Sequence, residues 1–186
     1  HEAMGTLRPW CAQRHGELSG LDEDFRLEYC PSVPVGEDAT VTGNNFREAL
    51  ASAQSKERAT GVTAAGPHRD DFSLLINQVD MGTFASRGQA RTIALTLRLA
   101  EAAYLSSVRQ EAPIILLDDV LSEMDSSRRL LVLEQLTQYQ QVLITTTDLE
   151  PVQDFFGPAA SYFRVGEGKV SPVAYQPDGS QPVGTY

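Results

Sequence analysis

The chain has 186 residues, of which 41% are hydrophobic and 22% charged, a composition typical of a soluble globular protein with one good core. Its net charge of −10 argues against a general nucleic-acid coat, because phosphate binding needs clustered Lys and Arg. No apolar run approaches the ~18 residues of a membrane span, and the N-terminus lacks the order of a signal peptide. We therefore expect a cytoplasmic protein with no membrane partner. Since the first residue is His, we expect a fragment of a longer protein.

The two cysteines, Cys11 and Cys30, stand alone in the sequence. With neither a CxxC pair nor a Cys/His cluster, the chain does not predict a structural zinc site. Two free thiols are expected, as is usual inside the cell.

The N-terminal quarter is expected to hold mixed structure around one strand. Residues 25–29, FRLEY, alternate apolar and charged side chains, which is typical of a half-exposed strand. Pro and Gly residues predict a loop over 31–43. Asn44 is the expected N-cap of a helix over 45–58, which a glycine follows.

The middle of the chain combines a Gly-Pro bend, a strand and a long helix. The string GPHRDD, 66–71, precedes a predicted strand over 72–76 and a turn over 77–82. Residues 89–109 contain many Ala and Leu and neither Gly nor Pro, so they predict a helix. Its wide apolar face indicates burial between other elements. That face comprises Ile93, Leu95, Leu97, Leu99, Ala100, Ala102 and Tyr104.

The C-terminal part alternates strands and helices, which indicates an α/β fold whose parallel strands are joined by helical crossovers. The apolar run 114–117 predicts a strand covered on both faces. The elements expected after it are a helix over 126–136 capped by Asp125, a strand over 141–146, a helix over 149–156, a hairpin of 162–165 with 170–175, and a disordered tail over 176–186.

Two carboxylates directly follow the first of these apolar strands. Residues 114–125 read IILLDDVLSEMD, so Asp118 and Asp119 stand at a strand end, where α/β sheets place ligands. Asp118 is predicted to hold Mg²⁺, which prefers oxygen ligands, and Asp119 to polarise an attacking water or accept its proton. The alternative is a pair of acids that merely begins a loop.

The residues that open the long helix suggest a phosphate contact. Ser86, Arg87, Gly88 and Gln89 bring free backbone N–H groups together at a helix N-terminus, where an anion is favoured. An ordinary Ser N-cap is the alternative. Together with the acid pair they indicate an ATP-driven protein, although no G-x-x-x-x-G-K-[ST] loop occurs in the chain.

Two further strings are candidate contacts. Residues 145–148, TTTD, end a predicted strand, where hydroxyls can sense a phosphate, although Thr is also simply common in strands. In GPHRDD the residues His68, Arg69, Asp70 and Asp71 lie beside a rigid bend. They suit a contact with nucleotide, DNA or another lobe, or an ion pair of Arg69 with a neighbouring carboxylate.

On the strings GPHRDD, FASRGQARTIALTLRLAEA, PIILLDDVLSEMD and VLITTTD, the chain resembles the C-terminal half of the bacterial RecF family. The resemblance implies a partial ABC-type ATPase head, with a parallel sheet flanked by helices, and part of a second, mainly helical lobe. The implied domains are 1–65 for the remainder of that lobe, 66–175 for the head, and 176–186 for a disordered tail.

The resemblance also implies roles by position. Residues 86–89 match the ABC signature, which contacts the γ-phosphate bound on the opposite subunit. Asp118 and Asp119 match the Walker B acids, with an Asp where transporters carry Glu. Ser122 and Asp125 bound the D-loop, and Thr147 stands where many ABC proteins have a switch His.

For the full-length protein the resemblance implies ATP and Mg²⁺ as cofactors, slow hydrolysis, an ATP-dependent homodimer, and binding to duplex and gapped DNA. It implies action with RecR and RecO in loading RecA at single-strand gaps, during DNA repair, replication, recombination and the SOS response to DNA damage. The fragment alone is expected to bind neither cofactor and to be inactive.

Three alternatives remain open on the sequence. One is the head of another ABC or SMC-type ATPase. Another is a Mg²⁺-dependent phosphoesterase, which needs several carboxylates to converge within about 4 Å around two metals. Its candidates are Asp70, Asp71, Asp118, Asp119 and Asp125. The last is a module that only binds partners.

Overall fold

The structure is a computed structural model that describes residues 2–122 and 124–175. The described chain falls into two compact units. Unit 1 comprises His1–Gly16 and Leu21–Tyr104, and unit 2 comprises Glu17–Gly20 and Leu105–Tyr186. The tail predicted to be disordered, 176–186, lies outside the described residues.

Unit 1 is built around a small antiparallel sheet. β1 (Phe25–Cys30) pairs with β2 (Asp71–Ile76), which pairs with the short β3 (Val79–Asp80). The apolar residues of β1 face a core shared with α1 (Glu2–Ser19), α3 (Met81–Phe84) and α4 (Arg87–Arg109), which confirms the predicted alternation. The buried members of this core are Cys11, Phe25, Leu27, Ile76, Met81, Ile93 and Ala100.

Both cysteines are free thiols in different surroundings. Cys11 is completely buried, and Cys30 is exposed at the end of β1. Burial raises the pKa of Cys11 to about 11, because a thiolate loses its hydration there. Cys11 therefore acts as an apolar core residue.

The N-terminal helices differ from the prediction. α1 (Glu2–Ser19) is a long helix despite Pro9 within it, and Arg8 Nε donates to the Leu27 carbonyl at 2.8 Å. α2 (Ala39–Thr60) begins earlier than expected, so the predicted loop over 31–43 was wrong in its last part. The N-cap is Asp38, not Asn44, because the Asp38 carboxylate accepts from Thr40 and Val41 N–H. The glycine expected beyond the helix does end it.

The turn expected over 77–82 is only partly a turn. Positive φ values at Asn77 and Gln78 make a two-residue bend, after which β3 and α3 begin. Asp80 caps α3 by accepting from the Gly82 N–H at 3.0 Å. The predicted bend is therefore shorter than expected.

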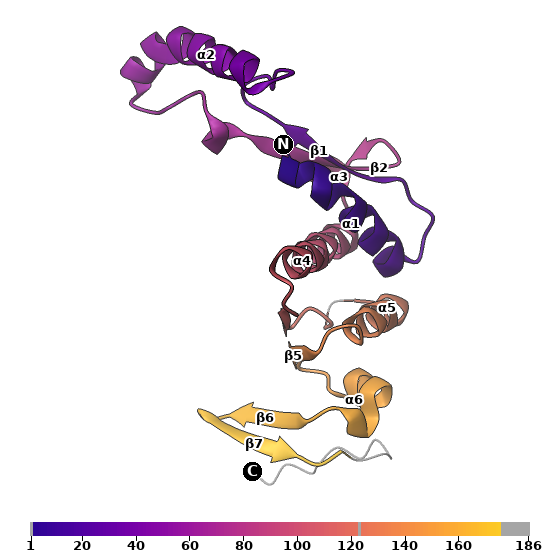
Figure 1. The fold of residues 1–186 in the computed structure, drawn as a ribbon. Coiled ribbons are helices and arrows are strands. Elements are labelled where there is room, and N and C mark those ends of the chain that lie inside the picture. Colours follow the sequence, from indigo (N-terminus) through magenta and orange to yellow (C-terminus); the bar gives the residue numbers. More distant parts are fainter. Residues whose placement is uncertain (1, 123, 176–186) are drawn as a thin grey trace. The chain divides into compact units, whose positions relative to one another are not determined.

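Unit 2 contains the parallel strand pair that the α/β pattern predicted. β4 (Ile114–Asp118) pairs with β5 (Gln141–Thr145), and α5 (Ser126–Leu136) connects them. Figure 1 labels the strand β5 with the helices α5 and α6 (Glu150–Phe156). Asp125 caps α5, as predicted, by accepting from the Arg128 N–H at 3.0 Å.

The prediction that β4 is covered on both faces was wrong for the described structure. Ile115 and Leu117 are 8% and 7% exposed, whereas Leu116, on the other face, is 71% exposed. Ile114 and Leu143 are exposed on that face as well. The pair therefore carries one buried and one open apolar face.

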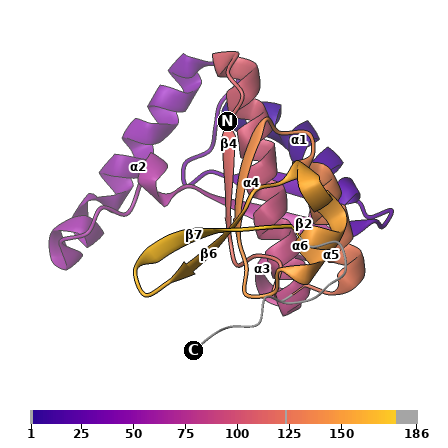
Figure 2. The same ribbon diagram turned by 90° about the horizontal axis from the view of Figure 1, so that it is seen from below.

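The chain continues into a short helix and a hairpin, both expected from the sequence. α6 (Glu150–Phe156) precedes β6 (Tyr162–Gly166) and β7 (Lys169–Val173), which form an antiparallel hairpin (Figure 2). The buried Tyr162 hydroxyl donates to the Gly157 carbonyl at 2.7 Å, which ties the hairpin to the end of α6.

Candidate functional site

The acid pair lies at the end of β4, directly beside the end of β5. In the parallel register Asp118 stands opposite Thr145. The Thr145 hydroxyl donates to Asp118 Oδ1 at 2.5 Å. It also accepts from the Asp119 N–H at 3.0 Å, which reaches the Thr145 carbonyl at 3.1 Å. Thr145 thus contacts the side-chain carboxylate of Asp118 and the backbone N–H of Asp119.

Asp119 leaves the strand in a left-handed backbone conformation, with φ 51°. The chain therefore turns away from β5 immediately after the ladder ends. Both carboxylates are exposed, so each can reach a ligand. An exposed carboxylate held by one hydroxyl keeps further oxygen lone pairs for a cation, and Asp118 accordingly fits the oxygen ligand that Mg²⁺ prefers.

The segment after the acids is held by short local contacts. The Ser122 hydroxyl donates to the Asp119 carbonyl at 3.0 Å. Asp125, besides capping α5, forms an ion pair with Arg128 at 3.5 Å. Glu123, inside the predicted D-loop, lies outside the described residues. Two of the predicted D-loop residues therefore have structural contacts of their own.

The predicted signature residues form a reciprocal cap on α4. The Ser86 N–H donates to Gln89 Oε1 at 3.0 Å, and the Gln89 N–H donates to Ser86 Oγ at 3.2 Å. This is a capping box, so the ordinary N-cap role is present. It does not exclude a phosphate contact, because the Ser86 hydroxyl accepts in this bond and keeps its hydrogen to donate.

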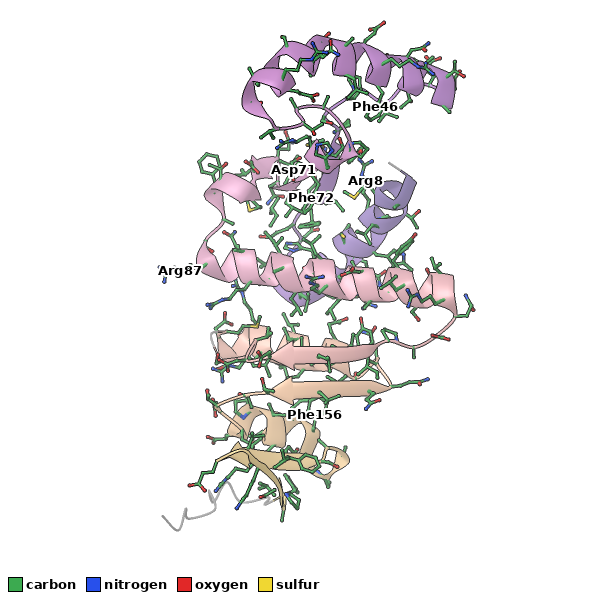
Figure 3. The ribbon with its side chains drawn as sticks, turned by 90° about the vertical axis from the view of Figure 1, so that its left-hand side faces the viewer. Arg8, Phe46, Asp71, Phe72, Arg87 and Phe156 are labelled. Carbon is green, nitrogen blue, oxygen red and sulfur yellow. The ribbon has the colours of Figure 1, made fainter. Side chains whose placement is uncertain are left out.

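The rest of the first turn of α4 remains accessible to an anion. The N–H groups of Arg87 and Gly88 have no carbonyl one turn earlier within the helix. Arg87 is exposed and its side chain extends away from the helix (Figure 3). Ser86 to Gln89 lie in unit 1 and the acid pair in unit 2.

The GPHRDD residues have more structural contacts than the sequence suggested. The Asp70 carboxylate accepts from the Tyr29 hydroxyl, and from the N–H and hydroxyl of Ser32 at 2.8 Å each. Asp70 therefore joins the end of β1 to the bend before β2. The Tyr29 hydroxyl and then Ser32 hold the pKa of Asp70 below its usual value.

The other three residues of this group behave differently. The ion pair suggested for Arg69 is not what the structure shows, since its Nε donates to the Thr63 carbonyl at 2.8 Å. Asp71 accepts from the following Phe72 N–H at 2.8 Å. His68 and Arg69 are exposed, which leaves them as the contact candidates of this bend.

Replacing Asp70 by Asn is expected to lower the urea midpoint of unfolding near neutral pH. Because the folded-state pKa of Asp70 lies below its ordinary value, its contribution is complete above about pH 4. That contribution is lost as the pH falls through the lowered value. The difference between wild type and Asp70→Asn should therefore shrink below pH 4. Asp71→Asn is the control, and equal pH profiles for the two variants would refute the assignment.

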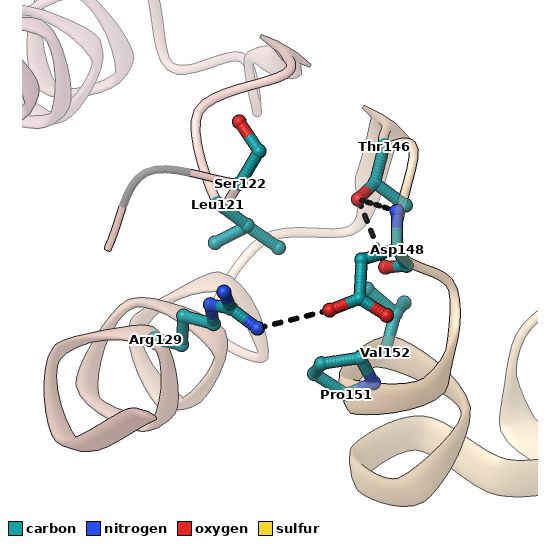
Figure 4. Close-up of a pocket in the computed structure, with 7 residues that line it drawn as sticks. All are labelled: Leu121, Ser122, Arg129, Thr146, Asp148, Pro151 and Val152. Carbon is teal, nitrogen blue, oxygen red and sulfur yellow. Dashed lines mark hydrogen bonds and ion pairs between the residues drawn. The ribbon is translucent and has the colours of Figure 1, made fainter. Parts of the chain in front are cut away.

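The remaining strand-end residues include contacts that the sequence did not reveal. Thr147, predicted at the switch position, is exposed. Its neighbours are tied together, because the Asp148 N–H donates to Thr146 Oγ at 3.1 Å. Arg129 then pairs with Asp148 at 3.2 Å (Figure 4). Neither this pair nor the Thr145 bond is readable from residue spacing, because both depend on strand register.

Within the described residues, no three His, Cys, Asp or Glu side chains are gathered as a metal site. No helix in residues 2–122 or 124–175 is long and apolar enough to cross a membrane.

Curated relatives share most of the chain. The DNA replication and repair protein RecF of Oceanobacillus iheyensis is 38% identical over 170 residues, 90% of this chain and 46% of the relative. The RecF of Synechocystis sp. is 37% identical over 168 residues, 90% of this chain and 44% of the relative. The chain therefore spans about half the length of the curated relatives it matches. No protein-family model matches the sequence.

Solved structures agree with this likeness. A structure of the recombination mediator protein RecF-ATPrS in the RecFOR pathway superposes with a TM-score of 0.75 at 30% identity, covering 93% of this chain and 45% of that chain. A structure from work on ATP-driven dimerization of SMC ATPases superposes with a TM-score of 0.55 at 12% identity, covering 93% and 86%. The second likeness concerns the fold alone, which is that of part of an ABC-type ATPase head.

Proposed function

We propose that the chain is part of a protein of the RecF family, to a member of which it is 38% identical over 90% of its length, and that it supplies one part of a composite ATP site in a dimerising ABC-type head. The observation that carries the proposal is the strand end, where the register sets Asp118 opposite Thr145 and the left-handed backbone at Asp119 bends the chain while its N–H still bonds Thr145. Such a strand end is where α/β sheets bind nucleotides. The relatives favour neither the phosphoesterase nor a head of another family.

The proposed roles follow from chemistry and position. Asp118 holds Mg²⁺, which supplies charge neutralisation on the phosphates, and Asp119 orients or deprotonates the attacking water. Ser86, Arg87, Gly88 and Gln89 present donors to a phosphate bound on a second copy. Ser122 and Asp125 bound the segment that meets that copy, and Thr147 lies near the phosphate.

The other half of the nucleotide site is proposed to lie outside this chain. No G-x-x-x-x-G-K-[ST] sequence occurs in the 186 residues, and the open face of β4 and β5 suits coverage by further residues of the head. The proposed division assigns residues 1–65 to a second lobe and 66–175 to the head, so β1 and β2 would form one sheet across the boundary between them.

For the whole protein we propose a cytoplasmic recombination mediator that binds duplex and gapped DNA, hydrolyses ATP slowly and acts with RecR and RecO to load RecA. ATP held between two copies makes dimerisation depend on nucleotide, because only the closed state contacts it fully. The net charge of −10 makes tight DNA binding by this chain alone unfavourable. His68 and Arg69 are candidate contacts with DNA, nucleotide or the other lobe.

Calorimetric titration with ATP and Mg²⁺ tests the proposal. This chain should show no binding tighter than roughly millimolar, which corresponds to about −4 kcal/mol. A full-length protein containing it should bind ATP and form dimers in sedimentation. Micromolar ATP binding by the chain alone would contradict the composite site. A full-length protein that neither binds ATP nor dimerises with it would contradict the proposed function.

A further inference from the structure

One arginine joins the two segments that follow the parallel strands. Arg129 lies in the first turns of α5, and its side chain is 21% exposed. Its Nε donates to the Met124 carbonyl at 2.9 Å, and its Nη1 contacts Asp148 Oδ2 at 3.2 Å. Met124 belongs to the segment after β4, and Asp148 to the loop after β5. A single guanidinium therefore bridges the two strand-end segments.

Both ends of this bridge are locally ordered. On one side, the Met124 N–H donates to the Leu121 carbonyl at 3.2 Å. On the other, the Thr146 hydroxyl donates to the Asp148 carbonyl at 2.9 Å and accepts from its N–H. These two bonds close a turn over residues 146–148, with the exposed Thr147 in the middle. Each segment thus has bonds of its own, and Arg129 adds a side-chain link between them beyond the Thr145 bonds at the strand ends themselves.

The surroundings restrict the guanidinium to this position. Figure 4 shows Arg129 pointing across a small hollow toward Asp148, with Leu121 and Val152 beside it. Both apolar residues are buried, at 2% and 7% exposure. A planar fork with fixed donors can satisfy a carbonyl and a carboxylate at once, which a lysine cannot do with the same geometry.

We propose that Arg129 is a positioning residue that couples the described residues after β4, 119–122 and 124–125, to residues 146–148 after β5. The inference rests on the proposed function, in which 146–148 lie near the bound phosphate and those residues after β4 meet the second copy. Nucleotide bound near residues 146–148 then holds the residues after β4, through Arg129, in the conformation that binds the second copy. Loss of the bridge should spare ATP binding and weaken dimerisation.

The neighbouring Arg128 provides a matched control. It lies one residue away on the same helix and also pairs with an acid, Asp125. That contact stays within residues 125–128 and does not reach the loop after β5. Arg128→Gln therefore removes an arginine and an ion pair without removing the bridge.

The test uses a full-length protein that contains this chain. Arg129→Lys should leave ATP affinity within about twofold and weaken ATP-dependent dimerisation about tenfold, a 1.4 kcal/mol change. Asp148→Asn should act in the same direction, and the double variant should be no worse than the stronger single one, because both remove one interaction. Arg128→Gln should dimerise like wild type. General loss of structure would not produce this split between ATP binding and dimerisation.

The results can distinguish failure of the Arg129 coupling from failure of the proposed function. A wild type that binds ATP and dimerises while Arg129→Lys and Asp148→Asn do the same overturns the coupling alone. Fully additive effects of the two substitutions also overturn it, as does an equal effect of Arg128→Gln. A wild type that does not dimerise on ATP overturns the proposed function and this inference with it. If Arg129→Lys fails to fold, Asp148→Asn decides from the exposed side of the pair.

Discussion

Replacing Asp118 by Asn in a full-length protein containing this chain should lower ATP hydrolysis at least about a hundredfold, because a catalytic metal stabilises the transition state by several kcal/mol and would be held less well. The amide removes the charge that the metal needs and keeps the size of the side chain. Thr145 can still donate to the amide oxygen, so the strand end should keep its bond. Hydrolysis is measured as phosphate release at saturating ATP and Mg²⁺.

A variant of the neighbouring Asp119 distinguishes loss of metal binding from loss of the group that activates water. Asp119→Asn should hydrolyse ATP about 10²- to 10⁴-fold more slowly, as expected for loss of a general base, yet still bind ATP and dimerise. Asp154→Asn, an exposed carboxylate on α6, is the matched control and should leave hydrolysis unchanged. Wild-type rates in Asp118→Asn would contradict the assignment of the acid pair.

Leu117→Ala in this chain should lower the free energy of unfolding by about 2–5 kcal/mol, the usual cost of a buried Leu→Ala change. Leu117 is 7% exposed on the covered face of β4. Its neighbour Leu116 is 71% exposed on the open face, so Leu116→Ala should change stability by no more than about 0.5 kcal/mol. Urea unfolding of the two variants compares the same substitution on adjacent residues.

The same pair of variants tests whether the open face is covered in the whole protein. In a full-length protein, Leu116→Ala should become destabilising, because further residues of the head are proposed to cover this face. If Leu116→Ala is neutral there as well, the face stays open and the proposed completion of the sheet is wrong. If Leu117→Ala is harmless in the chain, the packing described for β4 is wrong.

Helices with strong local signals could be predicted from the sequence. α4 is rich in good helix formers, and the cap of α5 at Asp125 was predicted to the residue. The sequence pattern does not predict α1, because Gly5, Pro9 and Gly16 each disfavour a helix. Its packing on the core of unit 1 overrides these local costs. The sequence predicts too late a start for α2, because Gly43 is typical of a loop, whereas Asp38 is the actual N-cap.

The position of the acid pair at a strand end was predictable from the sequence, whereas the contacts of the two acids were not. A carboxylate pair after an apolar run marks a strand end, and this held for Asp118 and Asp119. The partners Thr145 and Arg129 depend on how β4 and β5 align, and residue spacing does not fix that register. The apolar run of β4 likewise could not tell one covered face from two, because an apolar residue shows that burial is favourable and not that something covers it.

The left-handed backbone at Asp119 favours a short acid at that position. An L-residue in this conformation costs about 1–2 kcal/mol, and Asp and Asn bear it best because their short side chains bond the nearby backbone. Longer side chains gain less from such bonds, although this chain also holds Glu167 at φ 49°. With φ at 51°, the bend of the chain itself favours the shorter acid. The preference for the shorter carboxylate at this position can therefore come in part from the backbone of the folded chain, and not only from the reaction.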